Sequence, residues 1–492
     1  MFGQQPVYAD VVAGGQPKSK RGLVLGGGAL ALAIVAGGGI YMATQAGNSG
    51  GGQPEDLVPS TAFAFAKVDL DPAADQKVAI HEFSSKFPKA PKTTATDPID
   101  GLLTEAFKDN TGKCTYAADI KPWLGKRIGL AGIAGTAGKS QPLLVLQVKD
   151  TDKAKAAIAK LSSNACAAGD GSKDNLKGYT IKDGYAVIST TQADVDAALA
   201  ASKSKSLKDL GTYDKDVAKL DGSQVVVLWA DLKASFDAAA KESPQLNVIP
   251  NGVAKLITGR MVLGLHMANN YAELSGRVIG SDTSKMTGAT PDSLTKLPKS
   301  TVVAASFNGL QGLIEQQLTQ LGAVAPNLDS ALGAMGGGLG LDLKKDLLPL
   351  LGSTTTFSLG NIPKNPLDAQ FGLQSTITDP AAAAAAGKKL QKLAAKQGIK
   401  LDTDVAGKTF YLTSAGYAAT LKGDGGLGTS PAFTAAMGSL GDKVSGAVFM
   451  DIGQLSKLAG PNSTEAAPIS AFGMSYGKDG SDAYLRMRLV VK

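Results

Sequence analysis

Apolar and polar residues alternate with a period of two in several short segments of the chain, as in strands that bury one face. The alternation is clearest in residues 62–69 (AFAFAKVD) and 259–267 (GRMVLGLHM). Other segments place apolar residues every three or four positions, the spacing of amphipathic helices, and they include 152–161, 193–202 and 232–241. We therefore expect strands and helices to follow one another along most of the chain.

Two of the expected strand pairs are separated only by short polar turns. They span Tyr179–Ser189, with a turn at residues 182–184, and Met261–Arg277, with a turn at residues 268–270. Turns this short join antiparallel strands, whereas parallel strands need a long crossover connection. The sequence thus predicts an α+β fold with mostly antiparallel sheets.

Two blocks, residues 57–280 and 297–492, carry similar phrases in the same order. Residues 119–125 (DIKPWLG) match residues 346–352 (DLLPLLG), and residues 225–232 (VVVLWADL) match residues 445–452 (SGAVFMDI). Each block has the expected element order β-α-β-β-α-β-β-α-β-α-β-β. The collinear matches indicate an internal duplication, so we predict two homologous α+β halves with one strand order, joined by a linker at 281–296.

Four expected strands end in an acidic or amide residue that precedes a helix. Asp or Asn at such a junction is typical of an N-cap, which accepts hydrogen bonds from the first free amides of the helix. A ligand-binding ring is the alternative, and it requires all four side chains to converge. We favour caps at the four positions, which are Asp69, Asp231, Asn308 and Asp451.

An uncharged apolar segment at residues 22–44 predicts a single transmembrane helix. At 1.5 Å per residue this helix is about 34 Å long, enough to cross a hydrocarbon core of about 30 Å. Basic residues precede it at positions 18, 20 and 21, and none follows until Lys67. By the positive-inside rule the disordered tail 1–21 is cytoplasmic, and the chain after the flexible linker 45–56 lies outside the plasma membrane. A cleaved signal peptide is the competing interpretation.

Cys114 and Cys166 are the two cysteines of the chain, and both fall in the expected external part. Oxidising surroundings and an even cysteine count favour a disulfide between them. Two buried free thiols are the alternative. We predict the disulfide, with the two Cα atoms about 5–6 Å apart.

The composition argues against several classes of protein. Six of the fifty basic residues are arginines, and the net charge is only +7, so we expect no nucleic-acid partner. Two histidines and two cysteines are too few for zinc or iron–sulfur chemistry. The sequence therefore assigns no catalytic, cofactor-binding or metal-binding residue, and no cofactor.

Two short motifs resemble catalytic or nucleotide-binding signatures. Residues 473–477 fit G-x-S-x-G around Ser475, but a strand is expected after them and no histidine follows His266. Residues 423–428 fit G-x-G-x-x-G, but they lie late in an antiparallel block rather than in a first βαβ unit. We interpret the first as part of a strand and the second as a flexible surface loop.

These phrases, taken with the anchor, resemble a known family. The anchor is followed by L-x-P-x-(S/T), then by the P-Φ-L-G strand (Φ, apolar) and a hairpin with two Gly-Tyr pairs. In this order they resemble the domain-of-unknown-function 3352 family of actinobacterial single-pass membrane proteins, over residues 57–492. The resemblance implies a single-pass envelope protein and supplies no reaction, substrate or cofactor.

We therefore expect a membrane-anchored cell-envelope protein whose extracytoplasmic part binds or scaffolds, and which is not an enzyme. The partner is an envelope protein or an apolar ligand of unknown identity. One alternative is a carrier of an apolar or lipid ligand, which a large apolar cavity would favour. The other is an enzyme of unrecognised type, which a pocket with paired carboxylates or a Ser–Lys pair would favour.

Overall fold

The computed structural model describes residues 52–108, 114–162, 177–242, 257–284, 286, 292–324, 342–360, 368–423, 425–438, 440, 444–457 and 468–492. The expected tail, transmembrane segment 22–44 and most of the following linker lie outside these residues. Within them, no helix combines the length and the apolar character needed to span a membrane.

The first half contains eight strands and six α-helices among the described residues. Its strands are β1 (Ala64–Asp69), β2 (Leu124–Ala134), β3 (Ser140–Val148), β4 (Gly178–Lys182), β5 (Tyr185–Ser189), β6 (Val226–Asp231), β7 (Arg260–Ala268) and β8 (Tyr271–Ile279). Its helices are α2 (Ala74–Ser85), α3 (Pro98–Lys108), α4 (Thr151–Ser162), α5 (Gln192–Ser204), α6 (Thr212–Val217) and α7 (Leu232–Glu242).

The second half repeats the succession of strands, with one described α-helix between its first and second strands where the first half has two. Its strands are β9 (Val303–Asn308), β10 (Thr354–Leu359), β11 (Phe371–Thr376), β12 (Leu401–Ala406), β13 (Thr409–Ser414), β14 (Val444–Met450), β15 (Ile469–Asp479) and β16 (Asp482–Val491). Its helices are α9 (Asp292–Thr295), α10 (Leu310–Val324), α12 (Pro380–Lys396), α13 (Ala418–Lys422), α14 (Pro431–Met437) and α15 (Ile452–Leu455). The predicted strand order along the chain is confirmed in both halves.

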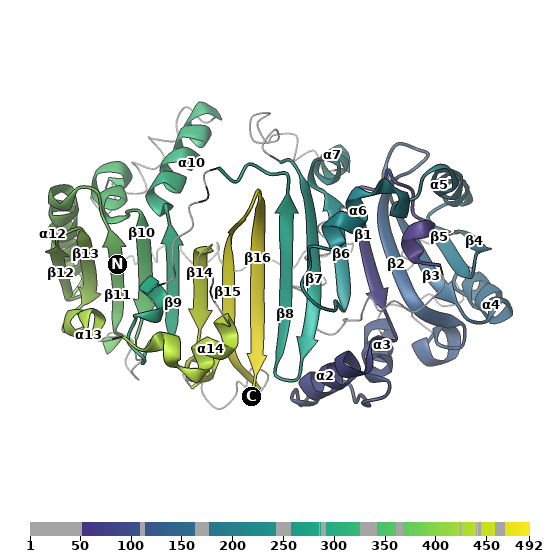
Figure 1. Ribbon diagram of the computed structural model, residues 1–492, viewed down its shortest axis with the longest axis horizontal. Helices are drawn as coiled ribbons and strands as arrows, with labels where there is room; N and C mark the ends of the chain where they lie inside the picture. The colour runs from purple at the N-terminus through teal and green to yellow at the C-terminus, as the bar shows by residue number, and fades with distance from the viewer. Residues whose placement is uncertain are drawn as a thin grey trace, which may run out of the picture.

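All sixteen strands form one antiparallel sheet rather than two separate sheets (Figure 1). The spatial order is β12-β13-β11-β10-β9-β14-β15-β16-β8-β7-β6-β1-β2-β3-β5-β4. Read outward from the centre, each half runs through its eighth, seventh, sixth, first, second, third, fifth and fourth strand. The two halves therefore have the same strand order, as predicted, and they join where β8 pairs with β16.

The pairing of β8 with β16, which we call the seam, is symmetric in register. Both strands follow two-residue turns, so Tyr271 and Asp482 are equivalent first residues. Ala272 pairs with Leu489, and the equivalent residues Ala483 and Val278 also pair. Ser275 and Arg486 are equivalent to each other and pair together. A local two-fold axis thus passes through this last pair.

Helices cover both faces of the sheet because neighbouring strand residues point to opposite sides. In β3, Leu143 and Val145 join a core with α5 and α6, while Leu144 and Leu146 face a core with α2, α3 and α4. In β13, Tyr411 faces the core formed with α13 and α14, and Phe410 joins the core formed with α12. Each half therefore has a hydrophobic core on each face of the sheet, and the first half adds a small cluster of Phe63, Ala64 and Ala230 beside α7.

The shared phrase around Asp119 and Asp346 has the same local structure in both halves. Each aspartate is the fourth residue of a five-residue π-helical turn and accepts a hydrogen bond from the backbone N–H four residues earlier, at 2.8 Å for Asp119 and 2.6 Å for Asp346. A lysine of the next long helix contacts each carboxylate at 2.5 Å, Lys160 in the first half and Lys389 in the second. The phrase therefore fixes a turn and the helix that packs over it.

The four strand-to-helix junctions divide into two kinds. Asp231 and Asp451 cap α7 and α15, because each Oδ1 accepts from the backbone N–H three residues later at 2.8 Å. Asp69 accepts from the Asp71 N–H at 2.9 Å, and α2 begins only at Ala74. Asn308 donates to the Val444 carbonyl and accepts from Thr354 Oγ1. The cap prediction is confirmed for two positions and wrong for Asp69 and Asn308, and the four side chains form no ring.

The packed body extends into both expected linkers. The Gly52 carbonyl accepts hydrogen bonds from Tyr185 Oη at 2.6 Å and from Arg127 Nη1 at 3.1 Å. At the other linker, α9 places Leu294 in the core of the second half, where it is fully buried. The packed residues therefore begin a few positions earlier than the expected boundaries at 57 and 297.

Candidate functional site

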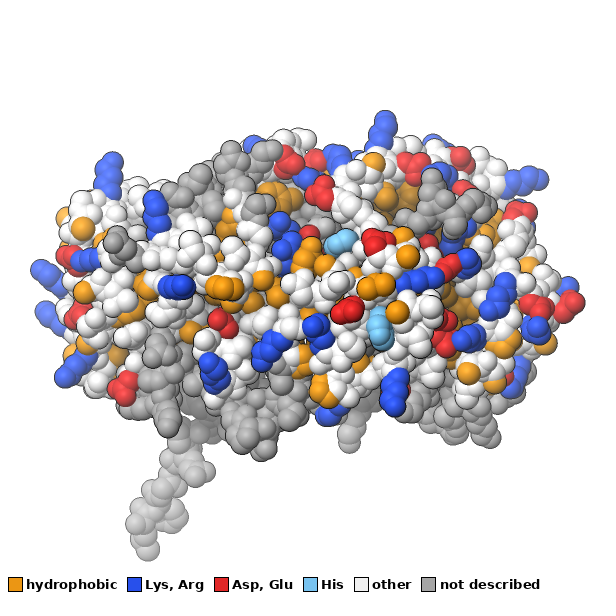
Figure 2. Space-filling view, turned by 60° about the horizontal axis from the view of Figure 1, so that its bottom comes forward, with side chains coloured by type: hydrophobic (Ala, Val, Ile, Leu, Met, Phe, Trp, Pro, Cys, Tyr) orange, Lys and Arg blue, Asp and Glu red, His pale blue; other side chains and the backbone are white. Residues whose placement is uncertain are grey.

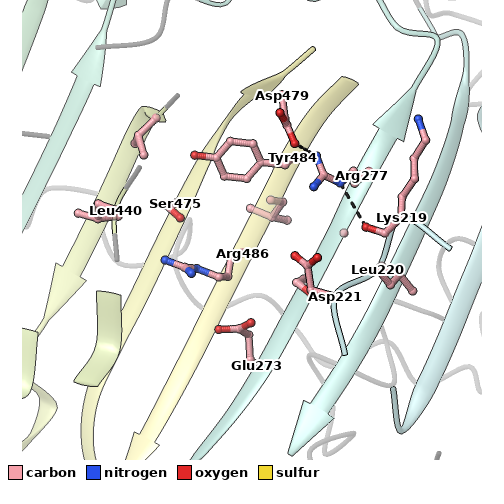
Figure 3. A pocket seen from close by; sticks show the side chains of 14 residues that line it. Lys219, Leu220, Asp221, Glu273, Arg277, Leu440, Ser475, Asp479, Tyr484 and Arg486 are labelled. Atoms are coloured by element: carbon pink, nitrogen blue, oxygen red, sulfur yellow. Dashed lines mark hydrogen bonds and ion pairs between the residues drawn. The ribbon is translucent and has the colours of Figure 1, made fainter. Parts of the chain in front are cut away.

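A cavity of about 430 Å³ lies over the seam, on the face of the sheet that α14 covers (Figure 3). Its floor comes from β15, β16 and β8, so both halves contribute. Its side walls come from the segments that follow α6 and α14. We call it the seam pocket, and its lining consists of Lys219, Leu220, Asp221, Glu273, Ser275, Gly276, Arg277, Leu440, Val444, Ser475, Asp479, Tyr484, Leu485 and Arg486.

Strand alternation explains why this face is polar. In β16, Tyr484, Arg486 and Arg488 share one face, and the intervening residues Leu485, Met487 and Leu489 share the other. The symmetric register places Arg277, Ser275 and Glu273 of β8 directly opposite the three polar residues. Charged side chains from two distant parts of the chain therefore meet on one side of the sheet.

Ion pairs hold several of these charges in place. Arg277 Nη1 lies 2.8 Å from Asp479 Oδ2, and Arg277 Nε donates to the Lys219 carbonyl at 3.4 Å. Glu273 accepts from Arg488 Nε at 2.8 Å and lies 2.6 Å from its Nη2. The two pairs leave the carboxylates of Glu273 and Asp479 and the guanidinium of Arg277 locally neutralised.

Arg488 also shows how tightly the seam is built. Its guanidinium lies 4.1 Å from the centre of the Tyr271 ring, a cation–π contact, and Nη1 donates to the Ala435 carbonyl at 3.1 Å. It therefore ties β16 to β8 through Glu273 and to α14 through Ala435. Arg488 is not among the lining residues of the seam pocket, so its role there is to hold Glu273.

Three hydrogen-bond donors gather on the β15 side of the pocket. Figure 3 shows the Tyr484 hydroxyl and the Arg486 guanidinium pointing the same way, with Ser475 of β15 between them. Arg486 Nη2 also donates to the carbonyl of Met437 at the end of α14. Burial raises the pKa of the Tyr484 hydroxyl, so this group remains a donor at neutral pH.

The pocket walls combine equivalent residues with residues that differ between the halves. Leu220 and Leu440 are equivalent and face the pocket from opposite sides. Ser475 is equivalent to Gly264, where a Cβ would lie 2.2 Å from Gln224 Oε1. The residue equivalent to Gln224 is Val444, whose shorter side chain cannot reach as far into the sheet. The seam pocket therefore extends toward the second half.

The expected motifs are used in other ways. The G-x-S-x-G segment lies inside β15, and a strand follows it. Gly473 is required there because a Cβ would lie 2.3 Å from the Ala436 carbonyl of α14. The interpretation as part of a strand is confirmed, and Ser475 nevertheless lines the seam pocket. Among the residues described, its side chain makes no hydrogen bond to a histidine, lysine or carboxylate.

The glycines at 423–428 lie in a surface segment that also packs closely against residues 295–297. A Cβ on Gly425 would lie 2.2 Å from the Lys296 carbonyl, and a Cβ on Gly428 would lie 2.8 Å from the Thr295 Cβ. Leu427 is fully buried, and its N–H donates to the Leu297 carbonyl at 2.9 Å. The surface-loop interpretation is confirmed for Gly423 and Gly425, which are exposed and lie outside helix and strand, whereas Leu427 and Gly428 begin a 3₁₀ turn that packs against the segment 295–297.

The structure describes only one of the two cysteines of the predicted disulfide. Cys114 is 2% exposed and belongs to the buried residues of the first half. Cys166 lies outside the described residues. The bridge between Cys114 and Cys166 therefore stays a prediction.

The arginines at the seam were missed by the sequence analysis. Four of the six arginines of the chain fall in the two terminal hairpins of the halves, at positions 260, 277, 486 and 488. Those at 277, 486 and 488 alternate with apolar residues in their strands. An uncommon charged residue on one face of two equivalent strands was the available signal, but only the pairing of β8 with β16 brings them together. The described residues contain no group of three His, Cys, Asp or Glu suited to a metal ion.

Surface charge is mixed over the face that Figure 2 shows. Lysine and arginine side chains are spread along its whole length, and acidic side chains lie between them. The small positive excess is therefore not gathered into one basic patch on this face. The seam pocket is the place where we find charged groups assembled around a cavity.

Fold and pocket define this protein as a one-sheet α+β protein with an internal two-fold arrangement and a ligand-sized cavity near its axis. A family model described as "Protein of unknown function (DUF3352)" matches residues 25–445, and the chain belongs to this family. The match begins inside the apolar segment 22–44 and ends at the start of β14, so it differs from the expected range 57–492. No curated protein and no solved structure matches the chain.

Proposed function

We propose that this protein is a non-enzymatic, membrane-anchored binding protein of the cell envelope, and that its extracytoplasmic part binds a small polar ligand in the seam pocket. One observation carries the proposal: both halves build a cavity of about 430 Å³ lined by charged and hydroxyl groups. This volume lies in the range of small-molecule sites in proteins. Binding there would also bridge the two halves.

The proposed anchor is the segment 22–44, with the N-terminus in the cytoplasm and the body outside the plasma membrane. Its support is the uncharged stretch and the basic residues that precede it. The hydrogen bonds to the Gly52 carbonyl hold that residue against the sheet. Residues 45–51 reach at most about 25 Å when extended, so the body would stay close to the membrane.

We further propose that the halves arose by duplication and that the Cys114–Cys166 disulfide stabilises the first of them. The duplication is supported by the matching sequence phrases, the matching strand order and the symmetric seam. The disulfide is supported by the external compartment and by the burial of Cys114.

A polar ligand fits this pocket better than the alternatives. A carrier of an apolar or lipid ligand would bury the lining arginines and carboxylates under hydrocarbon, which costs free energy unless those groups stay paired. An enzyme would need a base beside a nucleophile. Ser475 is the serine of the G-x-S-x-G motif. Within the described part of the chain, its side chain makes no hydrogen bond to such a base.

Thermal unfolding of the purified full-length chain in detergent tests the proposal. A panel of amino acids, short peptides, sugars, organic acids and phosphates is added, and a ligand raises the unfolding temperature because it binds only the folded state. The stabilisation should disappear in Ser275→Phe, which fills the pocket floor, and persist in Thr180→Phe on the edge strand β4. A panel without any stabilising member, or a stabilisation that survives Ser275→Phe, contradicts the proposal.

A further inference from the structure

From the distribution of charge in the seam pocket, we infer that its ligand is a small zwitterion, with a carboxylate and an ammonium group on an apolar skeleton. Free α-amino acids and short peptides have this chemistry. The inference rests on the proposed function, because it names the class of ligand that the same pocket takes.

The carboxylate of the ligand would bind on the β15 side of the pocket. There the Arg486 guanidinium and the hydroxyls of Tyr484 and Ser475 are directed at the same region (Figure 3). A guanidinium presents five N–H donors, so Arg486 can donate to a ligand carboxylate while it keeps its other interactions, the bond to the Met437 carbonyl among them. Hydrogen bonds from a charged donor to a carboxylate are among the strong ones in proteins.

The ammonium of the ligand would bind near Asp221, which lies at the rim of the pocket on the first-half side. The Asp221 side chain is exposed, and none of the residues that the structure describes forms a hydrogen bond or an ion pair with it. Glu273, by contrast, is held by Arg488 at 2.6 Å and 2.8 Å. Asp221 is therefore the lining carboxylate best placed to accept a new cation.

Charge balance excludes a strongly charged ligand. The lining contains three basic residues, Lys219, Arg277 and Arg486, and three acidic residues, Asp221, Glu273 and Asp479. A ligand with several negative charges would meet three carboxylates, and a ligand with several positive charges would meet the arginines. A zwitterion adds no net charge to this balanced cavity, so it leaves no uncompensated charge behind.

The apolar part of the ligand would pack between the equivalent side walls. Leu220 and Leu440 face the cavity from the two halves, and Val444 adds an apolar surface beside Leu440. An aliphatic side chain or backbone placed between the leucines would remove this surface from water. The three parts of the lining therefore match a ligand that has a carboxylate at one end, an ammonium group at the other and an apolar middle.

Isothermal titration of the full-length chain in detergent tests the inference with matched ligands. L-leucyl-L-leucine is the zwitterion, its N-acetyl derivative keeps only the carboxylate, and its C-terminal amide keeps only the ammonium. Free L-leucine is a further arm that separates amino acids from peptides. We expect the zwitterionic dipeptide or L-leucine to bind, and both blocked derivatives to bind at least threefold more weakly.

Two variants locate the charges. Tyr484→Phe should weaken binding of the zwitterion about fivefold, as expected for one lost hydrogen bond. Asp221→Asn should weaken it roughly threefold, as for an exposed ion pair, and should no longer distinguish the free amine from the N-acetyl derivative. The controls are Tyr476→Phe, on the opposite face of the same hairpin, and Asp237→Asn, exposed on α7. Both should bind as the unchanged chain does.

Two results overturn the inference. One is an N-acetyl or amide derivative that binds as tightly as the zwitterion. The other is a titration in which no zwitterion binds while another member of the thermal panel binds in a manner that Ser275→Phe abolishes. The second result leaves the proposed function standing and removes only the ligand class, whereas a panel with no binding member removes both.

Discussion

The two halves of the molecule share a scaffold and differ at its centre. Both arrange eight strands in the same spatial order, and β8 and β16 pair symmetrically about Ser275 and Arg486. At this axis, however, one half has a serine and the other an arginine. Equivalent apolar positions such as Leu220 and Leu440 stay apolar, while polar positions around the pocket diverge. The comparison indicates that packing fixes the scaffold, and that differences between the halves create the pocket.

A second difference lies inside the helix-covered cores. Tyr213 and Trp229 pack edge to face with ring centres 6.0 Å apart, and the equivalent Phe433 and Phe449 do the same at 5.1 Å. Only the first pair is joined to a buried carboxylate: Asp216 accepts from Trp229 Nε1 at 2.9 Å. The first half thus combines aromatic packing with a polar network that the second half replaces by apolar packing.

The largest expected effect comes from Asp216. This side chain is 2% exposed and also accepts from Arg260 at 2.6 Å and 3.0 Å. Asp216→Ala would leave a guanidinium and an indole N–H without their buried acceptor, so we expect a loss of about 3 kcal/mol in unfolding free energy. Urea unfolding measures it. The equivalent residue of the second half, Ala436, is already alanine and cannot serve as a control. Thr434→Ala on α14 is the control instead, and it should lower the unfolding free energy by less than half as much.

A smaller effect tests why Gly264 and Ser475 differ. Gly264→Ser forces the end of the buried Gln224 side chain to move, so we expect a loss of about 1–2 kcal/mol. Gln224→Val copies the second half and removes the clash. The double variant should therefore be more stable than the sum of the single changes predicts, by at least 0.5 kcal/mol or so in a double-mutant cycle. Strict additivity would contradict this explanation of the asymmetry.

The junction residues give a contrast of about 1 kcal/mol. Asp231 and Asp451 cap helices, so their replacement by Ala should each cost about 1 kcal/mol of stability. Asn308→Ala should act differently, because its bonds go to Val444 and Thr354 and not to a helix N-terminus. Hydrogen exchange of the first turns of α7 and α15 should speed up for the two aspartates only. Faster exchange at α10 in Asn308→Ala would contradict the assignment.

The pH dependence of stability should be the smallest effect and equal in the two halves. The ammonium of Lys160 and the Thr115 N–H hold the pKa of Asp119 below its usual 3.8, and Lys389 and the Asp342 N–H do the same for Asp346. A lowered folded-state pKa adds stability above pH 3.8 that is lost as pH falls through the folded value. Unfolding temperature should therefore decline below about pH 4, and less steeply in Asp119→Asn with Asp346→Asn.

The sequence predicted the elements well because their signals are local. The period-two alternation at residues 62–69 and the helical spacing at 152–161 correspond to β1 and α4. The cap prediction is wrong for Asp69 because aspartate also occurs in turns, where its side chain accepts a hydrogen bond from the backbone N–H two residues later. The close packing of two glycines has no local signal, because at Gly425 and Gly473 a backbone atom of another segment lies less than 2.5 Å from the Cβ position.

The single sheet and its pocket could not be predicted in this way. The pairing of β8 with β16 joins two strands that lie far apart in the chain. The residues of neither strand indicate which strand it pairs with. The pocket brings together Ser475, Arg486 and Asp221 only because β8 pairs with β16 and because the segment that follows α6 lies against this pair of strands. Local motifs therefore do not mark the candidate site, because it forms from side chains that only the pairing of β8 with β16 brings together.

Hydrogen exchange with and without L-leucyl-L-leucine tests most directly whether the seam is where this protein binds its ligand. Exchange is measured along the full-length chain in detergent at a saturating concentration of the dipeptide. We predict slower exchange in residues 271–279 and 482–491 together and in the segment 218–222, and little change in the edge strands β4 and β12. Slower exchange confined to one half, or protection that leaves β8 and β16 unchanged, would contradict it.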